Sequence, residues 1–317
     1  MKKTWMAAIL CLMCILLTAC SGQPAAVQDD VPIMLVDADA SALPGSQGVY
    51  SLYFHLGSGP YLATEERQVT VEQDETLEMA LVRQLIAGPS SSRTALNPLF
   101  PEGTEVIATS KQGDILFITL NEAFLTGYAA EKSGLSGEAR KNAIRVERQL
   151  CLDSLTATLT EAGVCTQVQI LIHRTQVQGN SLRLEEDYLL QNGSALPLAP
   201  SVRREESLYT PRNAAQHMLS LWMARDFDGL MSCICVQGRP GEQQVKEMLE
   251  GSPVLTGFVL SYGQPSADGT SAIVTADITF YKNESTWTIS GFPFRMQREN
   301  GVWKIHFDTL QNLMTGE

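Results

Sequence analysis

Residues 74–104 read DETLEMALVRQLIAGPSSSRTALNPLFPEGT, and this stretch decides the fold of the first half of the chain. Leucine recurs every four residues at positions 77, 81 and 85, which gives one apolar face and predicts a helix. Asp74 is the expected N-cap of this helix. Gly88-Pro89 is expected to end it, because glycine accepts a left-handed conformation and proline cannot continue the hydrogen-bond ladder.

Strand-like runs flank the helix on both sides. Two precede it and two follow the turn at Pro101-Glu102-Gly103-Thr104, and they are expected over Tyr50–Leu56, Gln68–Glu72, Glu105–Ser110 and Asp114–Asn121. A long helix from Glu138 to about Gly163 and a strand over Val164–Ile172 come next. Helices and strands mixed in this way predict an α+β domain.

Five short motifs occur in order, namely Leu52-Tyr53-Phe54, a turn at Glu66-Arg67, Leu85-Ile86-Ala87-Gly88-Pro89, the Pro101–Thr104 turn and the strand Gly113–Leu120. This order resembles the GerMN domain of bacterial sporulation and spore-germination lipoproteins, over about residues 49–178. The resemblance implies a domain that docks on proteins of the cell or spore envelope. An α+β domain with ordinary turn residues is the alternative, since each motif alone is short.

The N-terminus is similar to a bacterial lipoprotein signal. Lys2 and Lys3 are followed by the apolar run Trp5–Leu17, which is too short to span about 30 Å of hydrocarbon with ease. Leu17-Thr18-Ala19-Cys20 resembles a lipobox, in which the cysteine thiol receives lipid through a thioether. We therefore expect lipidation at Cys20 and anchoring to the extracytoplasmic face of the cell membrane. An ordinary secretory signal or a short membrane helix is the alternative.

The length of 317 residues suggests two domains. Composition divides the chain into an expected signal (1–20), a flexible tether (21–48), the GerMN-like domain (49–190), a linker (191–206) and a second domain (207–317). The second domain is expected to be α+β as well, with helices from Thr210-Pro211 onward and then strands over Val254–Tyr262, Ala272–Tyr281, Thr286–Arg298 and Val302–Asp308. It resembles the cone-shaped nuclear transport factor 2-like superfamily, including the final run Asn300–Ile305.

Charge argues against a nucleic-acid partner. The net charge is −12, whereas phosphate binding requires a basic face. Arg203-Arg204-Glu205-Glu206 is expected to be a solvated charge run rather than a binding signal.

Four cysteines remain beyond the signal and Cys20, and they are expected to be buried free thiols: Cys151, Cys165, Cys233 and Cys235. The first two are about 16 Å apart along the predicted helix, too far for a disulfide. The last two are too close for an unstrained bridge, and as a metal half-site they lack a second Cys or His pair.

No enzyme signature stands out in the sequence. Glu65-Glu66 is expected to form a polar turn, and the histidines show no metal spacing. Asp277, Tyr281 and His306 are the residues that could line an acid–base pocket in the second domain. Asp277 shares its strand face with two threonines, however, which indicates a solvated face. We therefore expect no catalytic, cofactor-binding or metal-binding residues.

Three functions from different classes follow. We expect a non-catalytic interaction module of the envelope, acting in sporulation or germination and bound to envelope or spore-envelope proteins. The alternative is a lipoprotein that binds a small ligand in the cone of the second domain. A hydrolase or isomerase that uses Asp277 and Tyr281 is the third reading.

Overall fold

The computed structural model describes residues 45–57, 59–174, 181–189 and 193–315. The expected signal, Cys20 and nearly all of the predicted tether lie outside the described residues. Within the described ranges, no helix is both long enough and apolar enough to cross a membrane.

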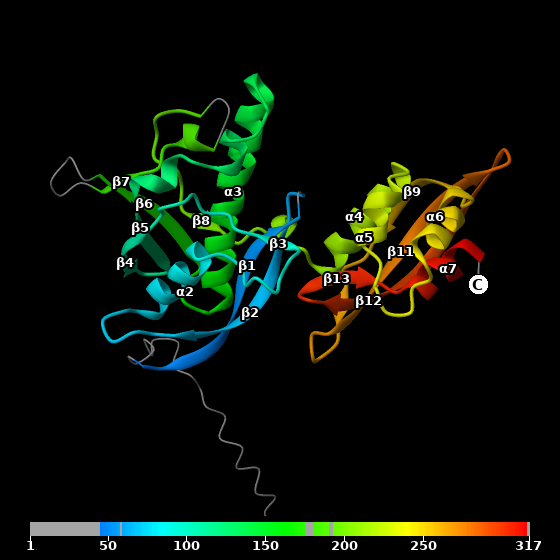
Figure 1. The fold of residues 1–317 in the computed structure, drawn as a ribbon, viewed down its shortest axis with the longest axis horizontal. Helices are drawn as coiled ribbons and strands as arrows, with labels where there is room; N and C mark the ends of the chain where they lie inside the picture. The colour runs from blue at the N-terminus through cyan, green and yellow to red at the C-terminus, as the bar shows by residue number, and fades with distance from the viewer. Residues whose placement is uncertain (1–44, 58, 175–180, 190–192, 316–317) are drawn as a thin grey trace, which may run out of the picture. The chain divides into compact units, whose positions relative to one another are not determined.

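A hairpin begins the first domain. Strands β1 (Gln47–Leu56) and β2 (Leu62–Thr70) pair antiparallel, and β3 (Leu96–Asn97) pairs with the other side of β1. Strands β1 and β2 are drawn in blue tones in Figure 1. Strand β2 runs unbroken through Glu66-Arg67, so the predicted turn at these residues is wrong. Their side chains alternate between the two sides of a pleated strand instead.

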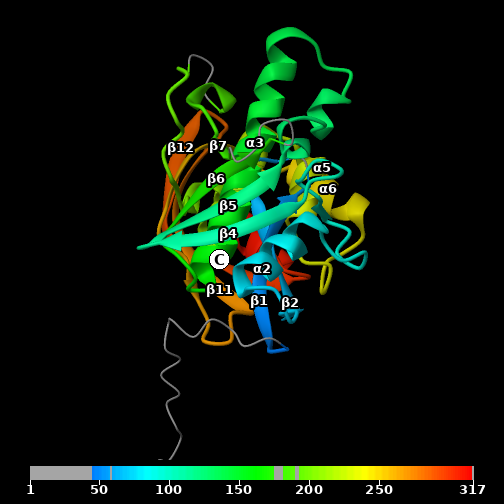
Figure 2. The same cartoon turned by 90° about the vertical axis from the view of Figure 1, so that its left-hand side faces the viewer.

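A second, five-stranded sheet forms the other half of this domain. Figure 2 shows its path in the order β4 (Val106–Gln112), β5 (Ile115–Asn121), β6 (Gln167–His173) and β7 (Ser181–Arg183). The short strand β8 (Ser201–Val202) pairs with the start of β6. Strands β5 and β6 are parallel, and the long helix α3 (Gly137–Glu161) lies between them in the chain. The strands predicted over Glu105–Ser110, Asp114–Asn121 and Val164–Ile172 and the long helix are thereby confirmed, with ends shifted by a few residues. The strand predicted over Gln68–Glu72 instead runs from Leu62 to Thr70.

Helix α2 (Leu77–Ile86) is the helix predicted from the leucine repeat. Leu81 and Leu85 are fully buried, which confirms the apolar face. The N-cap is Thr76 rather than Asp74, because the Thr76 side chain accepts the amide of Met79 at 3.3 Å. Beyond the helix, Gly88 has φ +83°, which confirms the left-handed end.

The second α+β unit begins with helices α4 (Pro211–Met223), α5 (Phe227–Ser232) and α6 (Glu242–Glu250). Thr210 caps α4 as predicted, since its side chain accepts the Asn213 amide at 3.2 Å. An antiparallel sheet follows, built from β9 (Val254–Leu260), β10 (Gln264–Pro265), β11 (Ser271–Lys282), β12 (Ser285–Glu299) and β13 (Val302–Ile305). The α+β prediction is confirmed for both halves of the chain.

The last predicted strand is too long. Strand β13 ends at Ile305, and helix α7 (Phe307–Thr315) follows it, although a strand was expected to Asp308. The apolar residues Phe307, Leu310 and Leu313 are spaced three apart, so a helix buries them on one side. The shorter 3-10 turns are η1 (Glu122–Leu125), η2 (Ala129–Glu131), η3 (Glu186–Tyr188) and η4 (Glu205–Ser207).

Candidate interaction surface

A buried carboxylate fixes the loop that follows α2. Glu65 is only 3% exposed, and its Oε1 accepts hydrogen bonds from Nε and Nη2 of Arg67 at 3.0 and 2.8 Å. The Ser90 amide donates to Glu65 Oε2 at 3.0 Å, and the Ser90 hydroxyl donates to Oε1. Burial alone would raise the pKa of Glu65, but the hydrogen bonds from Ser90 and Arg67 outweigh it and lower the pKa.

Arg67 also closes the end of helix α2. Its Nη1 donates to the Gln84 carbonyl at 3.3 Å and to the Gln84 side chain at 3.1 Å. Its Nη2 donates to the Gly88 carbonyl at 3.0 Å. A cation at these carbonyls satisfies acceptors that the helix itself cannot pair. The predicted polar turn at Glu65-Glu66 is therefore wrong: Glu65 points inward as a structural anchor, and Glu66 is exposed.

The second turn of the motif region is built as predicted. Gly103 has φ +80°, and Thr104 donates to the Pro101 carbonyl through its hydroxyl at 2.7 Å. The Asn121 side chain at the end of β5 donates to the Gly103 carbonyl at 2.8 Å. The motif residues thus shape the backbone and bind one another.

Strand β4 lies at an edge of the five-stranded sheet. Among the described residues it pairs with β5 alone, and its other side carries no strand (Figure 2). The register shifts between Val106 and Ala108, which places Ile107 at a bulge with 43% of its surface exposed. Helix α2 is tied to this strand by a hydrogen bond between the Thr76 and Thr109 hydroxyls at 3.2 Å. We call Val106–Gln112 together with α2 the β4 surface.

Arg83 of the β4 surface is paired with two acidic residues that precede α2. Arg83 of α2 contacts the carboxylates of Glu75 at 2.8 Å and Glu72 at 3.3 Å, and its side chain is 41% exposed. The hydrogen bond from Arg83 lowers the pKa of Glu75 against a smaller opposing effect of burial. A strand that pairs with a neighbour on one side only can accept a strand from another chain on its other side.

A cavity of about 590 Å³ opens beside the Pro101 turn. His55, Glu102, Tyr128 and Glu147 are among its lining residues. Three of these groups already have partners. Nε2 of His55 lies 2.7 Å from the Gly59 carbonyl, the Glu147 carboxylate accepts the Ala130 amide at 2.9 Å, and the Tyr128 hydroxyl donates to the Phe124 carbonyl at 2.8 Å. Burial raises the pKa of Tyr128, so its hydroxyl stays protonated.

The three candidate residues of the second half lie on or next to the strands of the antiparallel sheet. Asp277 is exposed on β11, and its Oδ1 accepts the Gly291 amide at 2.7 Å. Tyr281 is 43% exposed, and His306 is half-buried after β13. The solvated face predicted for Asp277 is confirmed. The opposite side of the sheet packs on the helices, with the rings of Trp222 and Phe280 5.8 Å apart.

The four remaining cysteines are free and buried, as predicted: Cys151, Cys165, Cys233 and Cys235. Burial raises the pKa of Cys165 and of Cys235 to about 11, so both thiols stay protonated near neutral pH. Within the described ranges, no group of three or more His, Cys, Asp or Glu residues is arranged to hold a metal ion.

The charge run is only partly solvated: Glu205 and Glu206 are exposed as predicted, but the prediction is wrong for Arg203 and Arg204. Both arginines are half-buried and contact helix α3. Asp153 of α3 is only 3% exposed. The four adjacent charged residues do not indicate this burial in the sequence. It results from pairing of the two arginines with acidic residues of α3 that are distant in the chain.

Residues 51–178 match the family model Germane, which is described as sporulation and spore germination. This match supports the GerMN domain predicted from the motifs. The tandem GerMN domains of the sporulation protein GerM from Bacillus subtilis are similar to 76% of this chain, at 13% identity and a TM-score of 0.35. The chain spans 63% of the length of that structure.

The first GerMN domain of the same protein is similar to 50% of this chain and is itself covered over 98% of its length. The identity there is 18% and the TM-score is 0.33. The comparison with curated proteins gives no match. The lipoprotein signal and the resemblance of the second domain to the nuclear transport factor 2-like superfamily stay predictions.

Proposed function

We propose that this chain is a lipid-anchored, extracytoplasmic protein that acts as a non-catalytic interaction module of the cell or spore envelope, in sporulation or germination. The observation that carries the proposal is the match of residues 51–178 to the sporulation and germination family. The lipobox-like run ending at Cys20 supports the anchor.

The residues of the motif region support docking rather than catalysis. Gly88, Pro101 and Gly103 shape the backbone, and neither glycine nor proline offers a nucleophile, a base or a metal ligand. Glu65 and Arg67 are occupied by each other and by the end of α2. These motif residues therefore fix the backbone of the domain, which fits a role in docking.

The β4 surface is the part of this domain that we expect to dock. An exposed strand edge pairs with a segment of another protein through backbone hydrogen bonds. A lipid anchor confines the protein to the membrane and raises its effective concentration near other envelope proteins, so even a weak contact is populated.

Crosslinking of the native protein in its own envelope tests the proposal. The full chain should capture a defined envelope protein. Ile107→Lys should weaken the capture at least tenfold, because it places a charge at the bulge of the edge strand. Val146→Lys is the matched control, since Val146 is 48% exposed on α3, away from β4, and it should capture as the wild type does.

Two results would overturn the proposal. Equal capture by the Ile107→Lys and Val146→Lys chains would show that the β4 surface takes no part in the contact. Catalytic turnover of a peptidoglycan or ester substrate by the purified, folded chain would show that the protein is an enzyme.

A further inference from the structure

Residues 201–213 connect the first domain to helix α4, and we call them the strap. The strap begins as β8, where Ser201 pairs with Val168 and Val202 with Gln167 of β6. Its first residues thus extend the sheet of the first domain, although they fall within the predicted linker. The contacts described below continue along the strap to the first turn of α4.

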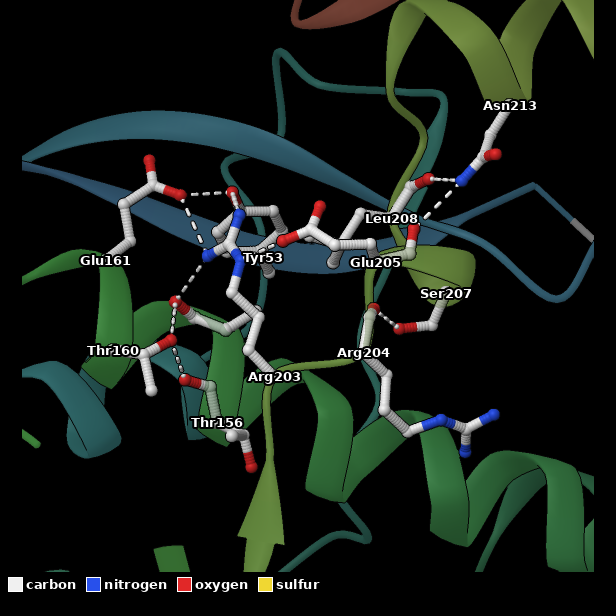
Figure 3. Close-up of polar contacts among 11 residues, drawn as sticks. Tyr53, Thr156, Thr160, Glu161, Arg203, Arg204, Glu205, Ser207, Leu208 and Asn213 are labelled. Carbon is white, nitrogen blue, oxygen red and sulfur yellow. Dashed lines mark hydrogen bonds and ion pairs between the residues drawn. The ribbon is translucent and has the colours of Figure 1, made fainter. Parts of the chain in front are cut away.

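Arg203 fastens the middle of the strap to β1 and α3. Figure 3 shows its guanidinium between Tyr53 and Glu161, with Nη2 3.0 Å from the Tyr53 hydroxyl and Nη1 3.1 Å from the Glu161 carboxylate. Nη1 also donates to the Ala157 carbonyl at 3.2 Å, and Nε donates to Glu205 at 2.7 Å. The Tyr53 hydroxyl in turn donates to Glu161. The guanidinium lies 5.3 Å from the centre of the Tyr53 ring, within reach of a cation–π interaction.

Arg204 adds a second contact to α3. Its Nη1 lies 3.8 Å from Oδ2 of the buried Asp153, and its Nε donates to Glu206 at 2.9 Å. The Ser207 hydroxyl donates to the Arg204 carbonyl at 2.8 Å (Figure 3). Two consecutive arginines therefore contact the same helix, one near its C-terminal end and one further toward its middle.

The C-terminal end of the strap contacts both strand β2 of the first domain and the first turn of α4. The Tyr209 amide donates to the Leu62 carbonyl of β2 at 2.7 Å, and Leu208 is only 2% exposed. The side-chain amide of Asn213, in the first turn of α4, donates to the carbonyls of Glu205 and Leu208 at 2.9 and 2.7 Å (Figure 3). Helix α4 is thus tied back to the strap that precedes it.

We propose that the strap is a clamp that joins the first domain to helix α4 without a flexible hinge. A linker that only had to connect two domains would need exposed polar residues and no partners. This segment instead carries two half-buried arginines, and each is paired with an acidic residue of α3. The first turn of α4 is therefore held to the strap, and the strap is held to β1, β2 and α3.

Hydrogen exchange on the full chain tests the clamp. Arg203→Ala should speed exchange of the amides of residues 201–209 at least tenfold, since it removes the contacts to Tyr53, Glu161 and Ala157. Asn213→Ala should speed exchange over residues 205–209. Arg140→Ala is the matched control, because Arg140 is exposed and donates to a single backbone carbonyl, that of Glu131, and it should change neither region.

The same data separate loosening of the strap from unfolding. Amides of the central strand β5 should keep their wild-type exchange in every variant if the strap opens alone. Wild-type exchange over residues 201–209 in Arg203→Ala would overturn the proposal. Equal acceleration in β5 and in the strap would also overturn it, because the strap would then be an inseparable part of the core rather than a clamp.

Discussion

The guanidinium of Arg67 lies on the same side of strand β2 as the carboxylate of Glu65, with Nη2 2.8 Å from Oε1. The same nitrogen reaches the Gly88 carbonyl at 3.0 Å. One arginine therefore neutralises a buried acid on a strand and closes the end of a helix. The Gly88-Pro89 motif and the Glu-Arg motif are parts of a single structure, although about twenty residues separate them in the chain.

Arg67→Ala should destabilise the first domain by about 3 kcal/mol, because it leaves the buried Glu65 carboxylate without its cation. Urea denaturation followed by circular dichroism measures this change. Arg174→Ala, at an exposed arginine after β6, should stay within about 0.5 kcal/mol of the wild type. A loss below about 1 kcal/mol in Arg67→Ala would show that solvent or a neighbouring group replaces the guanidinium.

Stability should fall in acid through Glu65. The hydrogen bonds to this carboxylate hold its pKa below the ordinary value of 4.5, so the unfolded chain binds the proton more tightly than the folded one. The stabilisation that Glu65 contributes is complete at pH values above its pKa in the unfolded chain. It is lost as the pH falls through the pKa of Glu65 in the folded chain. Glu65→Gln should be less stable than the wild type at neutral pH, and should lose less further stability below about pH 4.5. Denaturation midpoints across the acid range measure both effects, and parallel curves for the two proteins would contradict the assignment.

Gly88→Val should destabilise the first domain by at least about 2 kcal/mol, because valine at a positive φ is strained. A Cβ at this position would also lie 3.3 Å from Cβ of Pro98. Gly134→Val is the control, since Gly134 has open space around it and a φ that valine can adopt. Thermal unfolding of the two variants should separate them clearly, and equal midpoints would mean that the backbone relaxes around residue 88.

Cys20→Ser should release the protein from membranes, because serine offers no thiol for the lipid. Fractionation of cells after a high-salt wash measures the membrane-bound share. The Cys235→Ser chain is a control that keeps Cys20. If the Cys20→Ser protein still sediments wholly with membranes, the anchor is something other than this lipid.

Limited proteolysis should cut the full chain before Ser201 rather than within residues 201–209. Leu196 is 62% exposed, whereas Ser207, Leu208 and Tyr209 are buried. Mass spectrometry of the first fragments locates the cut. Early cleavage between Arg203 and Tyr209 would contradict the ordered strap, and early cleavage inside either half would contradict the two-domain organisation.

Apolar periodicity was enough to predict most of the elements. The leucine repeat predicted α2, and the alternation along residues 272–280 predicted β11 with Asp277 on its exposed face. These elements follow from sequence because each buries one face, and a buried face leaves a regular pattern of apolar residues. The turns at Gly88 and Gly103 could be predicted because backbone conformations with positive φ favour glycine.

The misses share a physical cause. Glu65, Arg67, Asp153 and Arg203 are charged, and hydropathy places such residues on the surface. Glu65 and Asp153 are buried, and Arg67 and Arg203 are half-buried, because each has a partner of opposite charge and contacts groups that are distant in the sequence, such as Ser90 for Glu65 and Gly88 for Arg67. Burial of this kind depends on the tertiary structure rather than on the hydropathy of neighbouring residues.

The N-cap prediction was wrong for a different reason. Asp74 and Thr76 are both good cap residues, and only the position at which the helix starts distinguishes them.

The parallel pairing of β5 and β6 has a consequence for the order in which the chain can fold. Strand β5 has no parallel neighbour until helix α3 and β6 have been synthesised, and β6 meets β8 only when residues 201–202 have emerged. A chain that appears from its N-terminus onward therefore carries an incomplete sheet for much of its synthesis. Pairings this distant are slow to form, and an unpaired strand edge is open to wrong partners meanwhile. The first domain is finished only when the residues that lead into the second have already been made.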